Sequence, residues 1–242
     1  MFRSFRSLKV AVIISLLAFA GCGKSETPAA KESADGDAVT ATEASASAKK
    51  PVIRPREYTP QPSIYVNAVA AIENPIVVMH TSAGDIKIEL ELERSPQTVL
   101  NFLENYVRTG FYEQTVFHFA DANSFVMGGG FTETLEAKET RNPVFNESNN
   151  GLSNVRGTIA MSRDASAAHS ATSQFFINVQ DNTDLDFQGT DSDAARGYCV
   201  FGRVIEGMEV VDKIAQSQIR QEGDFERLPV ESIVIQSIEE VP

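Results

Sequence analysis

The residue types that most often carry chemistry in proteins are sparse in this chain. Three histidines, His80, His118 and His169, are scattered, and none has the short paired spacing that is typical of metal ligands. The run Gly128–Gly130 lacks the Lys-Ser/Thr pair that follows a phosphate-binding glycine loop. No serine lies in the strand-to-helix elbow of a hydrolase nucleophile. We therefore predict no metal centre, no phosphate-binding loop and no serine-hydrolase site.

The first of the two cysteines lies in a segment that is typical of protein export. A positively charged start precedes an apolar run from Ala11 to Ala20, and Gly21 and Cys22 follow it. Small residues before a cysteine resemble the bacterial lipobox, although Phe19 takes the place of the usual leucine. We predict that residues 1–21 form a lipoprotein signal peptide and that Cys22 carries the lipid.

Two alternatives for the cysteines stay open. Plain signal-peptidase cleavage would leave Cys22 unmodified, and a disulfide between Cys22 and Cys199 is arithmetically possible. We favour lipidation, and we interpret Cys199 as a small buried apolar residue in a strand. Acyl chains bind a membrane at about 0.8 kcal/mol per buried methylene. Gly23 does not resemble the aspartate of an inner-membrane retention signal, so we expect an outer-membrane anchor facing the periplasm.

The composition divides the rest of the chain into a tether and a domain. Residues 22–62 are rich in Ala, Ser, Thr, Glu, Lys and Pro, which predicts a disordered linker. Residues 63–73 are a more apolar extension, and the sequence leaves open whether it packs on the domain, predicted over residues 74–242. The net charge of the chain is −12, and an acidic chain without a basic stripe repels phosphate backbones. We therefore exclude nucleic acid as a partner and predict membrane contact through the lipid alone.

The periodicity of the domain indicates many short strands and few helices. Apolar residues alternate with charged ones from Ile86 to Leu92, which predicts a half-buried strand paired with Ile76–Met79 in a hairpin. Ser95 as N-cap and Pro96 in the first turn predict a helix that ends at Gly110. A second helix is predicted over Met208–Gln216. Further strands are predicted at Val116–Phe119, Phe125–Met127, Gly157–Arg163, Gln174–Val179, Cys199–Ile205 and Ser232–Ile238. This pattern favours a closed antiparallel barrel.

Several segments, in order, resemble the cyclophilin family of peptidyl-prolyl cis-trans isomerases, especially its bacterial envelope members. The segments are Thr98–Tyr112, Phe117–His118 with Phe125–Phe131, Gly151–Met161, Ser170–Val179, Tyr198–Gly202 and Gly207–Ile214. The resemblance implies a mainly β fold, a closed eight-stranded antiparallel barrel capped by two helices. It also implies an outer groove for a proline-containing segment, and no metal or cofactor. We expect a monomer. The reaction would be rotation about an X-Pro bond. The barrier to this rotation is about 18–20 kcal/mol.

The resemblance does not extend to the family's main catalytic donor. In the family, an arginine directly after the Phe-His pair donates a hydrogen bond as the amide twists. Phe119 occupies that position here, and a phenylalanine side chain has no donor. Counted back from Gly128, the family's Phe-Met pair falls on Ser124 and Phe125, and its glutamine falls on Met127. The resemblance therefore assigns no certain catalytic residue.

Other groove positions match the family. The residues predicted to bind substrate are Phe125, Met127, Met161, Gln174, Phe176, Leu185 and Tyr198. Arg163 stands where many relatives have asparagine, and it is an alternative source of a cation. By type alone, Phe176 and Leu185 could equally be core residues. We interpret His118 as structural, at a barrel position whose hydrogen bonds are satisfied.

Two functions from different classes stay open. The first is an isomerase that assists the folding of envelope proteins, at a reduced rate because Phe119 replaces the arginine. The second is a non-catalytic module that binds proline-containing or unfolded segments. Phe119 and Met127 favour the second function, and the intact run Gln174–Val179 favours the first. We adopt the isomerase as the prediction.

Overall fold

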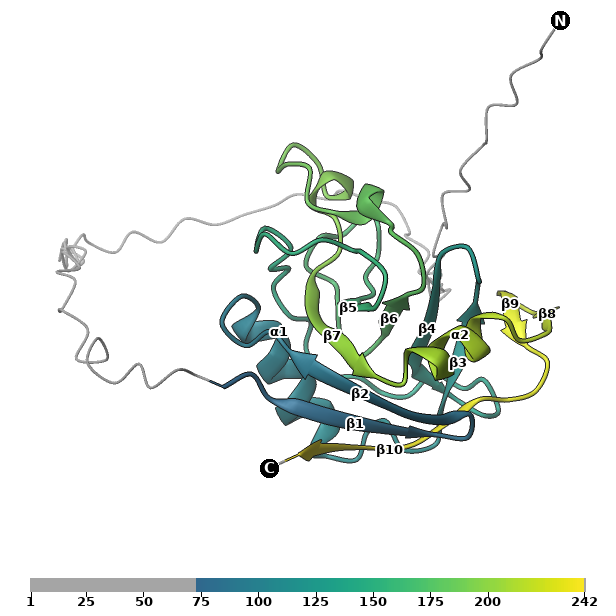
Figure 1. Cartoon of the computed structure of the whole chain (residues 1–242). Helices are drawn as coiled ribbons and strands as arrows, with labels where there is room; N and C mark the ends of the chain where they lie inside the picture. Colours follow the sequence, from purple (N-terminus) through teal and green to yellow (C-terminus); the bar gives the residue numbers. More distant parts are fainter. Residues whose placement is uncertain (1–72, 242) are drawn as a thin grey trace, which may run out of the picture. The chain divides into compact units, whose positions relative to one another are not determined.

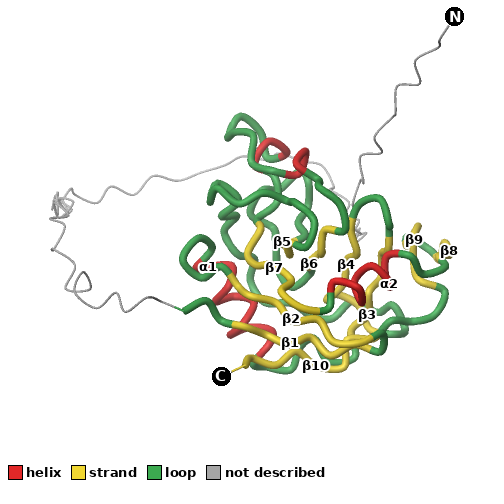
Figure 2. The backbone as a smooth tube through the Cα atoms, in the orientation of Figure 1, coloured by secondary structure: helices red, strands yellow, loops and turns green. Residues whose placement is uncertain are grey.

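The computed structural model describes residues 73–241. The predicted signal peptide, the lipidated Cys22, the tether and residues 63–72 of the extension lie outside the described residues. Within the described part, eight antiparallel strands close into a barrel in the order β1-β10-β3-β4-β6-β5-β7-β2 (Figure 1). Two α-helices accompany the barrel strands, and Figure 2 draws them in red together with the shorter helical turns. The predicted fold class is therefore confirmed.

The elements follow the chain in an order close to the predicted one. They are β1 (Ile76–Thr81), β2 (Gly84–Leu90), α1 (Pro96–Leu100), η2 (Asn101–Val107), β3 (Thr115–Ala120), β4 (Phe125–Thr132), β5 (Thr158–Met161), β6 (Phe175–Asn178), η3 (Thr183–Leu185), η4 (Ala194–Arg196), β7 (Val200–Glu206), α2 (Met208–Ala215), β8 (Ile219–Glu222), β9 (Phe225–Pro229) and β10 (Val234–Val241).

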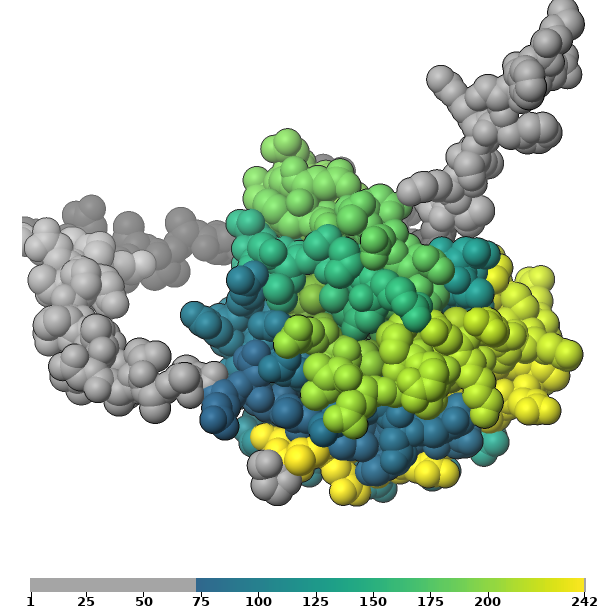
Figure 3. Space-filling view, in the orientation of Figure 1, coloured from purple at the N-terminus to yellow at the C-terminus, as the bar shows by residue number. Residues whose placement is uncertain are grey.

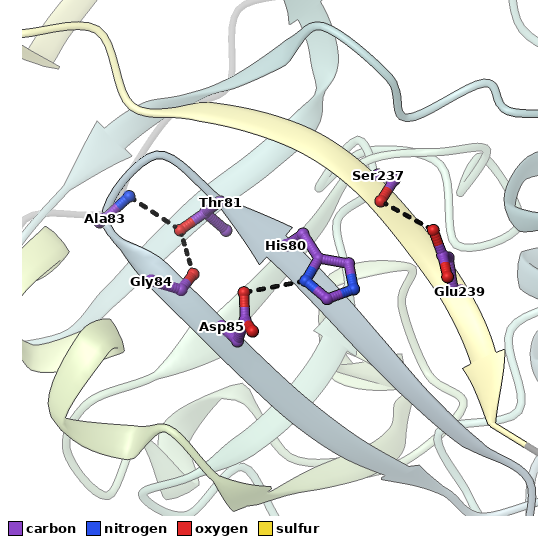
Figure 4. A network of polar contacts seen from close by, with 7 residues as sticks. All are labelled: His80, Thr81, Ala83, Gly84, Asp85, Ser237 and Glu239. Atoms are coloured by element: carbon purple, nitrogen blue, oxygen red, sulfur yellow. Dashed lines mark hydrogen bonds and ion pairs between the residues drawn. The ribbon is translucent and has the colours of Figure 1, made fainter.

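The first hairpin forms where the alternating sequence predicted it. Ile86, Ile88 and Leu90 of β2 are fully buried, whereas the charged residues between them are not. The turn is closed by Thr81, whose hydroxyl donates to the Gly84 carbonyl over 2.6 Å and accepts from the Ala83 amide over 3.1 Å (Figure 4). Burying one face of the hairpin while its turn is fixed sets the register of β1 on β2.

The first helix is capped by a residue that is distant in the sequence. Ser95 precedes α1 as predicted, but its hydroxyl donates to the Val200 carbonyl over 3.0 Å and caps no helix amide. The carboxylate of Glu147 accepts from the amides of Gln97 (3.1 Å) and Thr98 (2.8 Å) instead. Ser95 is thus the N-cap residue, as predicted, but the side-chain bonds to the helix amides come from Glu147.

Side chains from both helices and from alternate strand positions fill the barrel interior. Phe102 of η2 packs against Tyr112 (centroids 5.3 Å apart) and Phe175 of β6 (6.3 Å), and all three rings are buried. Val211 and Ile214 of α2 belong to the same core. Because the core draws on every part of the described chain, it holds the barrel wall in one shape.

A second hairpin, β8–β9, was not predicted. Its residues at Ile219–Glu222 are all exposed, so the period-two pattern that marks a half-buried strand is absent. The hairpin packs on β3 through Phe225, whose ring lies 6.0 Å from that of His118 and 4.9 Å from that of Phe131. Figure 3 shows this part of the chain in yellow at the surface beside α2. The hairpin therefore covers part of the outer barrel wall.

No helix among residues 73–241 is both long enough and apolar enough to cross a membrane.

Candidate functional site: an aromatic groove on the outer barrel wall

An irregularity in β3 decides which side chains reach the outer face of the barrel. Phe117 pairs with Gly128, but Phe119 pairs with Met127, so β3 has one more residue than β4 over this stretch. This extra residue is a β-bulge at His118. In a regular strand Phe117 and Phe119 would share a face. Here Phe117 joins the interior core, and Phe119 joins a separate cluster on the outside.

The outer cluster collects mainly apolar side chains from β3, β4, β5, β6 and β7, from η3 and from the loops before β5 and β7. Its members are Phe125, Met127, Ala160, Phe176 and Val200, with Phe119, Leu152, Leu185 and Tyr198 packed against them. Met127 of β4 lies opposite Phe176 of β6, which lies opposite Ala160 of β5. We call this cluster the outer groove, after the groove that the family resemblance implies at these positions. Five of the seven residues predicted to bind substrate belong to it, together with Phe119.

Four aromatic rings form a row along the outer groove. Phe119 stacks on Phe125 with centroids 5.2 Å apart and an interplanar angle of 29°. Phe125 contacts Phe176 at 4.9 Å, and Phe176 contacts Tyr198 edge-on at 5.7 Å. We call these four residues the aromatic row. A row of this kind gives an apolar ring a well-defined surface on which to lie.

Arg163 lies at the Tyr198 end of the aromatic row, with its guanidinium carbon 4.7 Å from the ring centre. Its Nε donates to the Gly197 carbonyl over 2.7 Å, and its other nitrogens donate to the carbonyls of Asp164 (2.7 Å) and Asp193 (2.9 Å). The residue is 5% exposed, and burial lowers the pKa of its guanidinium. Arg163 thus holds the loop before β7 in place, with its side chain directed at backbone carbonyls.

Arg227 lies at the Phe119 end of the aromatic row, and the sequence analysis did not find it. Its guanidinium carbon is 5.9 Å from the Phe119 ring centre. Its Nε donates to the Ala120 carbonyl over 3.1 Å, and its Nη2 lies 3.2 Å from a carboxylate oxygen of Asp121. Arg227 comes from β9, more than a hundred residues after β3. No local spacing in the sequence connects it with Phe119.

Two predicted site residues lie apart from the aromatic row. Met161 is 2% exposed and belongs to the interior core, where β5 places it opposite Phe175. The side chain of Gln174 lies across Gly130 of β4, because a Cβ at Gly130 would be only 2.5 Å from the Cγ of Gln174. Only glycine leaves room for the amide there. Gln174 therefore stands beside the outer groove rather than within its apolar cluster.

His118 differs from the prediction. It is buried between the rings of Phe131 and Phe225, and its Nδ1 has no hydrogen-bond partner in the described part of the chain. The hydrogen bonds of this side chain are therefore not all satisfied, in contrast to the prediction. Burial lowers its pKa to about 4, so the ring is neutral at physiological pH.

Titratable groups that could hold a metal ion do not gather in the described region. Among residues 73–241, no group of three His, Cys, Asp or Glu side chains is placed to share one ion. The chemistry of the outer groove therefore has to be read from its apolar surface and its hydrogen-bond donors.

Comparison with known proteins shows the family of this chain. Residues 76–240 match the family model of the cyclophilin type peptidyl-prolyl cis-trans isomerases. The chain belongs to this family.

Individual relatives agree with the family match. The chain is 47% identical over 163 residues to peptidyl-prolyl cis-trans isomerase B of Escherichia coli (strain K12), covering 67% of this chain and 98% of that protein. It is 48% identical over 170 residues to peptidyl-prolyl cis-trans isomerase A of Dickeya dadantii (strain 3937), covering 70% of this chain and 86% of that protein.

A solved structure supports the same fold. It is a cyclophilin type peptidyl-prolyl cis-trans isomerase of Cryptosporidium parvum, crystallised in the presence of the dipeptide Ala-Pro. The TM-score is 0.57 at 24% sequence identity, and the match covers 67% of this chain and 96% of that one. At this identity the likeness concerns the fold alone.

Proposed function

We propose that this protein is a peptidyl-prolyl cis-trans isomerase with a reduced rate, which acts on proline-containing segments of envelope proteins. The observation that carries the proposal is the aromatic row on the outer barrel wall. Phe125 and Phe176, which are 7% and 2% exposed, form an apolar floor with Met127, and Leu185 packs against it. Membership of the cyclophilin family supports rotation about the X-Pro bond as the reaction.

Such a site can accelerate rotation if it binds the twisted amide more tightly than the planar one. As the amide twists, its resonance is lost, and the carbonyl oxygen and the prolyl nitrogen change their demand for hydrogen bonds. The apolar floor of the outer groove can hold the ring and exclude water, which leaves the rest of the chain free to turn. Tyr198 and Gln174 add neutral donors at the side of the groove.

The reduced rate follows from the residue at position 119. Phe119 contributes a ring but no donor, and Met127, its partner across the strand pair, contributes none either. Loss of one positioned donor to a transition state typically costs about 10²–10³ in rate. We therefore expect isomerisation that is measurable but slower than that of a relative with a donor in this position.

The decisive experiment measures cis-to-trans isomerisation of an Ala-Pro peptide by the purified full chain and by Phe119→Arg. The Escherichia coli relative serves as the control. We expect the wild-type kcat/KM to be at least about tenfold below the control, and Phe119→Arg to raise it by about tenfold or more. A wild-type rate equal to the control would contradict the reduced activity.

A non-catalytic binding module is the second candidate function, and the absence of a donor at Phe119 and Met127 favours it. The same assay separates the two. A wild-type rate and a Phe119→Arg rate that both equal the uncatalysed rate, with the peptide still bound by the chain, would establish the binding module and end the isomerase proposal.

The place of action in the proposal is the periplasmic face of the outer membrane, with the domain held by lipid on Cys22. This part is supported by the order of charged, apolar and small residues before Cys22. Mass spectrometry of the protein extracted from membranes should find an N-terminal acylated cysteine, and Cys22→Ala should release the protein from the membrane fraction. An unmodified Cys22 in the mature chain would contradict the anchor.

A further inference from the structure

The outer groove needs a hydrogen-bond donor, and its own apolar residues provide none. The two guanidinium groups that lie over rings of the aromatic row, within residues 73–241, are those of Arg163 and Arg227. Arg163 is buried and directs its nitrogens at three backbone carbonyls. Arg227 is therefore the cation at this surface that a bound segment can reach.

The geometry points to Arg227 as the residue that donates hydrogen bonds from its guanidinium to a backbone carbonyl of the proline-containing segment in the outer groove. This inference rests on the proposed function, and it assigns to β9 a donor that β3 lacks. Arg227 contacts the substrate in this assignment and acts when the X-Pro amide twists.

The guanidinium of Arg227 has N–H groups that no contact within the described chain uses. It carries five N–H groups, and two contacts within the described chain engage it: Nε to the Ala120 carbonyl and Nη2 to Asp121. Nη1 has no partner among the described residues. The side chain is 38% exposed, in contrast to buried Arg163, so solvent reaches part of it.

Contacts on both sides of Arg227 and a hydrogen bond of its own hold this residue in position. On β9, Phe225 packs against His118 and Phe131, and Leu228 is 4% exposed, so residues on both sides of Arg227 are anchored to the domain. The bond to the Ala120 carbonyl then fixes the guanidinium at the end of β3. A donor held in advance loses little side-chain entropy when a segment binds, which makes each of its hydrogen bonds more effective.

Phe119 has a complementary part in this arrangement. Its ring lies between Arg227 and Phe125, within the range at which a cation is attracted to an aromatic face. A segment that lies on Phe125 and Phe176 would extend past Phe119 toward the guanidinium. Phe119 therefore extends the apolar surface while Arg227, from outside the barrel, supplies the charge.

The test compares Arg227→Gln with Arg220→Gln in the full chain. Arg220 is on β8 of the same hairpin, and it pairs with Glu222 rather than with the groove. Both changes remove one positive charge. Because the site is partly exposed, we expect Arg227→Gln to lower kcat/KM for the Ala-Pro peptide by about tenfold, mainly through kcat. Arg220→Gln should leave kcat/KM within about twofold.

A double-mutant cycle with Phe119→Arg separates a donor from a merely structural residue. If Arg227 acts as a donor, Arg227→Gln should have less than about a twofold effect in the Phe119→Arg chain, since a second guanidinium then serves the groove. A structural effect would be as large in both backgrounds and would overturn the inference. Arg227→Lys, which keeps the charge and the packing of the stem, should retain more activity than Arg227→Gln.

Peptide affinity distinguishes failure of this inference from failure of the proposed function. If the wild-type chain binds the peptide but does not isomerise it, the isomerase proposal fails. Arg227 is still upheld as a donor if Arg227→Gln weakens binding by about fivefold or more relative to Arg220→Gln. If Arg227→Gln changes neither rate nor affinity in a chain that isomerises, the proposed function stands and the role of Arg227 is refuted.

Discussion

At the scale of single residues, burial has suppressed most of the titratable chemistry that the sequence offers. Cys199 is 4% exposed, and burial raises the pKa of its thiol to about 11. A thiol of this kind stays protonated and unreactive at neutral pH. His118 likewise stays neutral, so neither residue contributes a charge to the outer groove. The positive charges that border the aromatic row come from Arg163 and Arg227.

His118 should make the stability of the domain depend on pH. Its pKa is about 4 in the folded chain and about 6.5 when unfolded, so the unfolded chain binds the proton first as the pH falls. Its share of stability is complete above about pH 6.5 and is lost progressively down to about pH 4, by about 3 kcal/mol. Chemical unfolding of wild type and His118→Leu at pH 7 and pH 4.5 checks this. Equal losses in the two proteins would show that His118 does not titrate in this way.

At the scale of elements, the second helix shows that burial outweighs an exposed ion pair. Ile214 of α2 is fully buried in the core. Asp212, on the same helix, forms a bidentate pair with Arg156 at 2.8 and 2.7 Å, which lowers the pKa of its carboxyl, but both side chains are partly exposed to solvent. Water and salt therefore screen most of the attraction.

This contrast gives a stability prediction for α2. Ile214→Ala should lower the free energy of unfolding by about 2–5 kcal/mol, because it removes buried methyl groups and leaves a cavity. Asp212→Asn should lower it by less than about 1 kcal/mol. Urea unfolding of both variants measures the two effects. If Asp212→Asn lowered the free energy of unfolding by several kcal/mol, the pair between Arg156 and Asp212 would be a main source of stability at this end of the barrel.

At the scale of the whole molecule, barrel closure is what creates the site. β1 pairs with both β2 and β10, so strands from opposite ends of the described chain form one seam. His80 of β1 faces Ser237 across this seam and contacts Asp85 at 2.9 Å (Figure 4). The outer groove then combines β3, β4, β5, β6 and the loop before β7. None of these segments would present an aromatic row alone.

The sequence by itself determined the barrel strands, the helices and most of the groove. The alternation of apolar and charged residues from Ile86 to Leu90 is a local pattern, and so are the segments that resemble the cyclophilin family. Local patterns can be recognised in the sequence without knowledge of the fold. Phe125, Met127, Phe176, Leu185 and Tyr198 were found in this way and do lie together. The substitution at Phe119 was also visible, because it changes residue type at a recognisable position.

Only the tertiary structure decided the bulge at His118, the remote cap of the first helix and the location of Arg227. A bulge depends on how many residues the partner strand supplies, and β4 supplies one fewer than β3. Glu147 and Arg227 reach α1 and Phe119 from segments far along the chain. Such contacts depend on the energy of the closed barrel rather than on local propensity, so no spacing in the sequence encodes them directly. The closed barrel likewise decides that Met161 faces the interior core and that Phe119 faces the outer groove.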